Sequence, residues 1–209
     1  LAKTEIVAEE IQQEEDNYVA ALEWGEANGA DVVNSSLGYL DWYSYCDMDG
    51  NTAITTIGVD IAASLGLVCV TSAGNWANED PPEDPCESLS YYISAPADAD
   101  SVIAVGAVSA DSLIVYFSSR GPSYDGRIKP EVSTLGVNVA AANPAGGYSV
   151  FYSGTSASSP LVAGAAAVLL SANPQWTNME IREALMMTAS QADIPNNDYG
   201  YGLVNIWSA

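Results

Sequence analysis

Hydrophobic and polar positions along this chain alternate between a helical period and short apolar runs. Over residues 14–28, Tyr18, Leu22 and Gly25 recur at helical spacing among acidic residues. This spacing is typical of a helix with one buried face. Gly29 follows at a position where a glycine commonly ends a helix. The pattern therefore predicts a helix here that ends at Gly29.

Strands are predicted on either side of a second helix, which is expected over residues 53–65 and ends near Gly66. The runs at 30–34, 67–71 and 101–108 are short and mostly apolar. The continuous apolar runs at 67–71 and 101–108 indicate strands buried on both faces, as in parallel sheets. Alternation of such strands with helices predicts an α/β fold, with an open parallel sheet covered by helices on both faces.

The later part of the chain adds two shorter strands, at 137–141 and 148–152, and two helices. The helix at 156–172 is apolar on nearly every side, so we expect it to be central and buried. The last helix begins at Thr177 with a Thr-x-x-Glu capping box, in which Glu180 is the acidic member. No repeat or linker interrupts the chain, which predicts one domain.

Charge restricts the partners that this surface can bind. The 209 residues include 27 Asp and Glu against 5 Lys and Arg, a formal charge of −22. Without a cluster of cations to neutralise phosphates, nucleic acid and an anionic membrane surface are disfavoured partners. The apolar run at 161–170 is too short to span a bilayer. The acidity favours a surface that stays hydrated at high salt or that gathers cations.

The chain contains no histidine. Any mechanism in which these residues alone supply an imidazole base, or a histidine metal ligand, is therefore excluded.

Three cysteines allow at most one disulfide within the chain. Cys69 lies in an apolar run and is expected to be buried as a small hydrophobe. Cys46 and Cys86 lie in polar stretches rich in Asp and Pro, and we expect them to pair, which implies an oxidising, secreted context. The alternative is two unrelated surface thiols.

A small-residue turn, Gly154-Thr155-Ser156, opens onto the helix predicted at 156–172. The hydroxyl of Ser156 would then lie at the positive end of the helix dipole, where free N–H groups stabilise an anion. Taken alone, a Ser or Thr at a helix start is usually only an N-cap.

Two further polar stretches follow predicted strands. Ser72-Ala73-Gly74-Asn75 places an asparagine amide, a neutral donor suited to an oxyanion, at the carboxyl edge of the sheet. Asn34-Ser35-Ser36-Leu37-Gly38 ends in a glycine that allows an extended peptide to approach the backbone. We expect Ser156 and Asn75 to converge at this edge.

Together these stretches resemble blocks of the subtilisin-like serine proteases, the subtilases. The segment from Gly154 to Ala165 resembles the block around the nucleophilic serine, Ser72 to Asn75 the oxyanion block, and Ser36 to Gly38 the substrate-pairing segment. Further matches, in chain order, are Ser101 to Ala107, Phe117 to Pro122, Lys129 to Val132 and Tyr201 to Asn205.

The resemblance implies roles for individual residues. Ser156 would be the nucleophile and Asn75 the oxyanion donor, while the substrate would contact Ser36, Leu37, Gly38, Ala73, Gly74 and Gly154. The family's catalytic aspartate and histidine precede the serine, and neither block is found here. Residues 1–209 are therefore interpreted as the C-terminal part of a subtilase catalytic domain, opening with a sheet strand at Leu1 to Thr4. Departures from the family pattern at Ala157, Leu161 and Thr134-Leu135 remove no reactive group.

Two alternatives concern the acidic residues. The sedolisin relatives use acids with serine, and Glu10, Glu14, Glu15 and Asp16 share one early helix, although such a run is usually a solvated face. The resemblance also allows structural calcium, and acidic clusters occur at Asp47/Asp49, Glu79 to Asp84 and Asp98/Asp100. Calcium requires more oxygen ligands than one such cluster supplies, so salt-tolerant surface charge is favoured. No cofactor is required for the chemistry.

The leading hypothesis is thus a secreted serine endopeptidase acting on polypeptides, whose missing triad residues come from an N-terminal part of the same protease. The alternative is a catalytically inactive, peptide-binding pseudo-protease. A structural scaffold explains poorly why all three blocks are present together.

Overall fold

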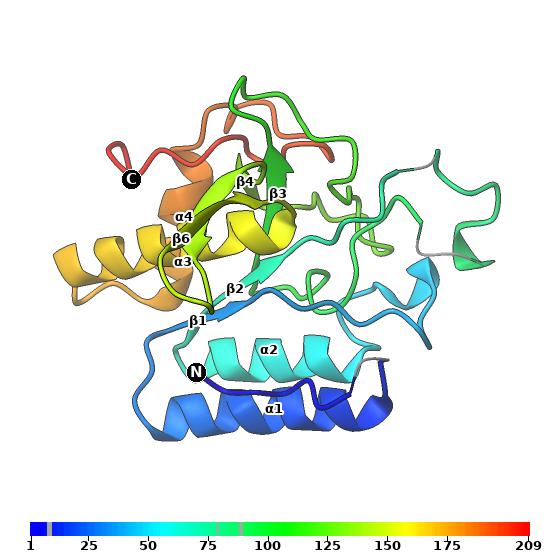
Figure 1. The fold of residues 1–209 in the computed structure, drawn as a ribbon, viewed down its shortest axis with the longest axis horizontal. Helices are drawn as coiled ribbons and strands as arrows, with labels where there is room; N and C mark the ends of the chain where they lie inside the picture. Colours follow the sequence, from blue (N-terminus) through cyan, green and yellow to red (C-terminus); the bar gives the residue numbers. More distant parts are fainter. Residues whose placement is uncertain (8–9, 79, 88–89) are drawn as a thin grey trace.

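The computed structural model describes residues 1–7, 10–78, 80–87 and 90–209 (Figure 1). Within these residues the main sheet has strand order β1-β2-β3-β4, and every neighbouring pair is parallel. The strands are Val32–Ser35 (β1), Val68–Ser72 (β2), Ile103–Val108 (β3) and Val132–Leu135 (β4). The predicted α/β class with an open parallel sheet is confirmed.

Helices cover both faces of this sheet (Figure 1). One face carries α1 (Gln12–Ala27) and α2 (Ile54–Ser64), and the other carries α3 (Thr155–Ala172) and α4 (Asn178–Met187). Gly29 has φ +77°, as the glycine that ends α1 requires. The predicted capping box at Thr177 is confirmed, since its hydroxyl accepts from the Glu180 amide.

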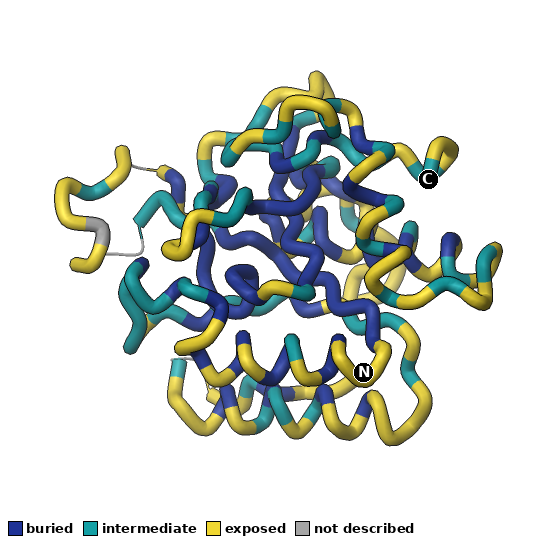
Figure 2. Tube along the Cα trace, turned by 180° about the vertical axis from the view of Figure 1, so that it is seen from behind, coloured by how far each residue is buried: buried dark blue, intermediate teal, exposed yellow. Residues whose placement is uncertain are grey.

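The core is divided by the sheet into two layers. On β2, Val68 and Val70 pack toward α3 and α4, whereas Cys69 packs toward α1 and α2. Every residue of β2 and β3 is buried, which confirms the prediction of strands covered on both sides. Figure 2 shows these central strands in dark blue and the outer faces of the helices in yellow.

The remaining elements are short. An antiparallel hairpin joins β5 (Val139–Ala142) to β6 (Tyr148–Tyr152), directly before α3. Two 3₁₀ turns lie in long loops, η1 at Tyr45–Asp47 and η2 at Pro85–Glu87. The hairpin strands were predicted, but the turns were not.

Three expectations differ from the structure. Strand β4 was not predicted, because only Val132 and Leu135 are apolar in it and its 4 residues are too few to show a strand period. Residues 1–7 form no strand, although one was expected at Leu1 to Thr4, and the first five of them line a cavity. Helix α3 is buried on one side only, with Leu161 and Val168 exposed on the other.

Helix α3 is longer than the apolar run at 161–170 that lies within it. Its 18 residues have a mean hydropathy of 1.4, so it is long and apolar enough by length and composition to cross a membrane. It packs against all four strands of the sheet, and 44% of the helix is buried.

A buried ion network ties β4 and α4 to the start of β3. The Lys129 ammonium donates to the Ala99 carbonyl at 2.7 Å and to the Glu131 carboxylate at 2.9 Å. Arg182 donates to the same carboxylate at 2.8 Å, and the Ala104 amide donates to its second oxygen. Burial lowers the pKa of Lys129, and the adjacent carboxylate opposes this shift. Removing Glu131 would leave a buried cation unpaired.

The expected disulfide is present. Cys46 in η1 and Cys86 in η2 are bonded, with Cα atoms 5.0 Å apart, and the bond joins the two loops that carry these turns. Cys69 is free and buried, and burial raises the pKa of its thiol to about 12. Disulfides of this kind persist in oxidising compartments.

Replacing Cys46 and Cys86 together by serine should lower the free energy of unfolding by about 2–4 kcal/mol, because the bond closes a loop with a sequence separation of 40. Urea unfolding of both proteins measures the loss. In denatured but unreduced protein, thiol titration should detect only Cys69. Detection of all three thiols would contradict the pairing.

Candidate active site

The amino end of α3 lies where three strands of the sheet end. Gly154 donates to the carbonyl of Gly136, just after β4, and Thr155 contacts Gly74, just after β2. Ser156 reaches Ser36, just after β1. Open α/β sheets bind ligands at this carboxyl edge. The structure thus brings the predicted blocks together at the expected edge.

Ser156 is the second residue of α3 and is exposed. Its hydroxyl donates to the carbonyl of Ser36 at 3.2 Å. Gly154 caps the helix with φ +142°, a conformation that other residues rarely adopt. The first amides of a helix have no partner within the helix, so their N–H groups favour negative charge beside the Ser156 hydroxyl.

Asn75 is oriented by Thr155. The Oδ1 atom of Asn75 accepts from the Thr155 amide at 2.8 Å and lies 3.1 Å from the Thr155 hydroxyl. That hydroxyl also bridges to the amide and carbonyl of Gly74. Because both contacts use the amide oxygen, the amide nitrogen is the end of Asn75 left to donate. Thr155 is buried and was not predicted as a site residue, although its place between Gly154 and Ser156 is the signal for it.

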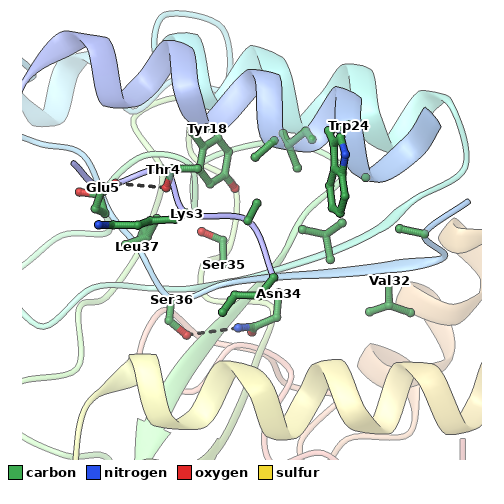
Figure 3. Close-up of a pocket in the computed structure, with 17 residues that line it drawn as sticks. Lys3, Thr4, Glu5, Tyr18, Trp24, Val32, Asn34, Ser35, Ser36 and Leu37 are labelled. Atoms are coloured by element: carbon green, nitrogen blue, oxygen red, sulfur yellow. Dashed lines mark hydrogen bonds between the residues drawn. The ribbon is translucent and has the colours of Figure 1, made fainter. Parts of the chain in front are cut away.

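A second set of hydrogen bonds joins β1 to α3. Pro160 has no N–H, so the carbonyl of Ser156 lacks its usual helical donor four residues ahead. The Ser36 hydroxyl donates to that carbonyl at 2.9 Å instead. Asn34 in turn donates to Ser36 at 3.3 Å (Figure 3) and accepts from Ser159 at 2.7 Å. Asn34 and Ser159 had not been singled out as site residues from the sequence.

Serine side chains pack closely against two of the predicted substrate-contacting glycines. A Cβ on Gly38 would lie 2.6 Å from the Ser94 hydroxyl, and one on Gly74 would lie 2.8 Å from the Ser119 hydroxyl. The carbonyl of Leu37 accepts from Ser72 at 3.4 Å, and the carbonyl of Ala73 accepts from the Ser94 amide at 3.3 Å. These contacts fix the two loops on either side of Ser156.

The acids of the first helix are engaged elsewhere. Glu14 and Glu15 are buried, which corrects the expectation of a solvated face. Glu14 accepts from the amides of Ile6 and Val7, and these bonds lower its pKa. Burial raises the pKa of Glu15, which accepts from Trp42 and Tyr43. Throughout the described residues no hydrogen bond joins these acids to Ser156, so the sedolisin-like alternative has no geometric support.

The carboxylates considered for calcium also have protein partners. Asp49 accepts from the Asn51 amide and the Thr52 hydroxyl, one at each oxygen. Buried Asp98 accepts from Thr56 and from the Gly50 amide. Within the ranges that the structure describes, no three acids or cysteines converge as metal ligands. Glu79 lies outside the described residues. The side chains of Asp49 and Asp98 are therefore engaged within the protein.

A cavity of about 680 Å³ lies beside β1 (Figure 3). The opening residues Leu1 to Glu5 form one wall, and α1 contributes Tyr18 and Trp24. The chain from Val32 to Leu37 forms another wall, so the cavity reaches Ser36, which contacts Ser156. Its lining is mostly apolar, and it lies at the free edge of the sheet.

Comparison with known proteins supports one family. The model of the subtilase family matches residues 4–202. Subtilisin E of Bacillus subtilis (strain 168) is 38% identical over 192 residues, covering 91% of this chain and 44% of that protein. Subtilisin of Bacillus pumilus is 38% identical over 191 residues, covering 91% of this chain and 60% of that protein. The chain thus spans about half the length of the curated relatives that it matches.

Solved structures agree on the fold. The prenylagaramide maturation protease PagA matches with a TM-score of 0.76 at 23% identity, covering 97% of this chain and 69% of that one. The self-cleaved protease domain of PatA matches with a TM-score of 0.73 at 24% identity, covering 93% and 66%.

Proposed function

Because this chain belongs to the subtilase family of serine proteases, we propose that it carries the nucleophile and the oxyanion site of a subtilisin-like endopeptidase. The observation that carries the proposal is the exposed Ser156 at the amino end of α3, with Asn75 held beside it by Thr155. The fold alone would not suffice, since one fold hosts many functions.

In the proposed reaction, the Ser156 hydroxyl attacks the scissile carbonyl of a polypeptide. The negative charge that develops on the carbonyl oxygen is stabilised by the Asn75 amide and the Ser156 backbone N–H. The helix dipole of α3 acts in the same direction. When this intermediate collapses, the scissile C–N bond breaks and the amine leaves with the proton that came from Ser156. The acyl group stays on the Ser156 oxygen until water hydrolyses the ester.

The proton of Ser156 requires a base that these residues do not contain. The chain has no histidine, and the hydroxyl donates to the Ser36 carbonyl, which is not a base. We infer that a histidine outside the 209 residues accepts the proton, with an aspartate orienting it. The reaction needs no cofactor.

The substrate is proposed to be an extended polypeptide. Ser36 to Gly38 and Ala73 to Gly74 form the walls on either side of Ser156, and an extended backbone would lie along them. The Cys46–Cys86 disulfide supports a secreted, extracellular protein.

Covalent labelling tests the proposal in the complete protein that contains this chain. A fluorophosphonate probe should label Ser156 in stoichiometric amount, and Ser156→Ala should abolish both labelling and casein cleavage. If the complete protein binds peptides but is not labelled, the pseudo-protease alternative is correct. The observation that favours this alternative is the absence of histidine from the 209 residues.

A further inference from the structure

Three glutamates near the start of the chain accept hydrogen bonds from successive residues of a single loop. Glu5, Glu10 and Glu15, together named the glutamate clasp, accept hydrogen bonds from the loop Tyr39 to Tyr43. This loop directly follows Ser36 to Gly38, the segment proposed to pair with substrate. Neither the family blocks nor the reaction mechanism uses the clasp.

Every residue of the loop donates to the clasp. The Tyr39 hydroxyl donates to Glu5 at 2.9 Å. The amides of Leu40 and Asp41 donate to one oxygen of Glu10 at 3.1 and 3.0 Å. The contacts to Glu15 come from the Trp42 indole at 2.7 Å and the Tyr43 hydroxyl at 2.9 Å. Hydrogen bonds to carboxylates are stronger than neutral ones, so this loop is held firmly.

The clasp includes a buried carboxylate, that of Glu15. Glu15 is 1% exposed, and burying a carboxylate is unfavourable unless its oxygens are hydrogen-bonded. Burial raises the pKa of Glu15, and the bonds from Tyr43 and Trp42 oppose this rise. The Tyr43 hydroxyl also accepts from the first amide of α2, Ile54, which extends the network to the second helix.

The clasp acts on the end of the substrate-pairing segment. Before Gly38, the Leu37 carbonyl accepts a hydrogen bond from Ser72. After Gly38, the Tyr39 amide donates to the Ala95 carbonyl. Beyond Tyr39, the main chain of Leu40 and Asp41 is held by Glu10. Without these bonds, substrate binding would have to order the loop as well, and ordering on binding weakens affinity.

We propose that the glutamate clasp positions the substrate-pairing segment Ser36 to Gly38, with Glu10 as its principal positioning residue. This inference rests on the proposed protease function. Because the loop lies beside the substrate backbone and not at the reacting carbonyl, loosening it raises KM and leaves kcat unchanged.

The test compares Glu10→Ala with Glu10→Gln and with Glu26→Ala in the complete protease. Glu26 is an exposed glutamate at the other end of α1 and is the matched control. For peptide substrates, Glu10→Ala should raise KM about tenfold, with kcat within about twofold of the original. Glu10→Gln should recover most of the loss, because its amide oxygen can accept from both loop amides.

Amide hydrogen exchange gives a second readout that does not depend on activity. Exchange at Leu40 and Asp41 should be about tenfold faster in Glu10→Ala than in the original or in Glu26→Ala. Faster exchange with KM equal to that of Glu26→Ala would overturn the positioning role, and so would a fall in kcat. Unchanged exchange would overturn the clasp itself.

The two proposals fail in different ways. If the unsubstituted protein shows no turnover dependent on Ser156, the proposed protease function fails. Peptide affinity, measured by fluorescence anisotropy on the same variants, then replaces KM and still decides whether Glu10 positions the segment.

Discussion

Isolated from any other polypeptide, the 209 residues should hydrolyse casein at least about 10²–10⁴-fold more slowly than the complete protease. A serine hydroxyl is a weak nucleophile until a positioned base removes its proton. The chain has no histidine, and the Ser156 hydroxyl donates to the Ser36 carbonyl. The oxyanion donors remain in place, so weak binding of peptides should persist while turnover is lost.

The measurement is labelling of the purified chain with a fluorophosphonate probe beside an intact subtilase. Ser156→Ala provides the background. Stoichiometric labelling of the chain that disappears in Ser156→Ala would refute this expectation, because it would show that an acid or a partner chain activates the serine. The acids of α1 are poor candidates, since Glu14 and Glu15 are buried and bonded to other groups.

Much of this site could be predicted from the sequence because its residues follow strongly apolar strands. Each polar stretch directly after such a strand has to lie at the carboxyl edge of a parallel sheet. Ser36 and Asn75 are therefore expected at this edge. Ser156 follows the exposed hairpin strand β6 and was predicted instead from the small-residue turn that opens a helix; the structure brings the three segments together. The Cys46–Cys86 disulfide could also be predicted from the sequence, because the two loops that carry these cysteines follow neighbouring strands and come close on one edge of the sheet.

The residues that orient the site could not be predicted in the same way. Asn34 accepts from Ser159, which lies 125 positions further along the chain, so only the folded structure shows this contact. The acidic run on α1 has the composition of a solvated face, and yet Glu14 and Glu15 are buried. Their partners, the amides of Ile6 and Val7 and the side chains of Trp42 and Tyr43, leave no local pattern in the sequence.

Replacing Asn75 by Asp should reduce kcat of the complete protease by about 10²–10³-fold, the range that loss of the oxyanion asparagine has in subtilisin. Asp keeps an oxygen to accept from the Thr155 amide and hydroxyl, so the local structure is retained. It removes the amide donor and adds negative charge where the oxyanion forms. KM should change little, because the lost interaction is made only in the transition state.

Two controls separate chemistry from folding in this experiment. Asn75→Ala loses the oxygen as well as the nitrogen and leaves the Thr155 amide without its acceptor, so it should also destabilise the fold by about 1–3 kcal/mol. Thr155→Ser keeps the hydroxyl and should retain most activity. If Asn75→Asp folds normally and keeps its kcat, Asn75 does not stabilise the oxyanion, because the substitution keeps the positioning bonds to Thr155 while it removes the donor and adds a negative charge.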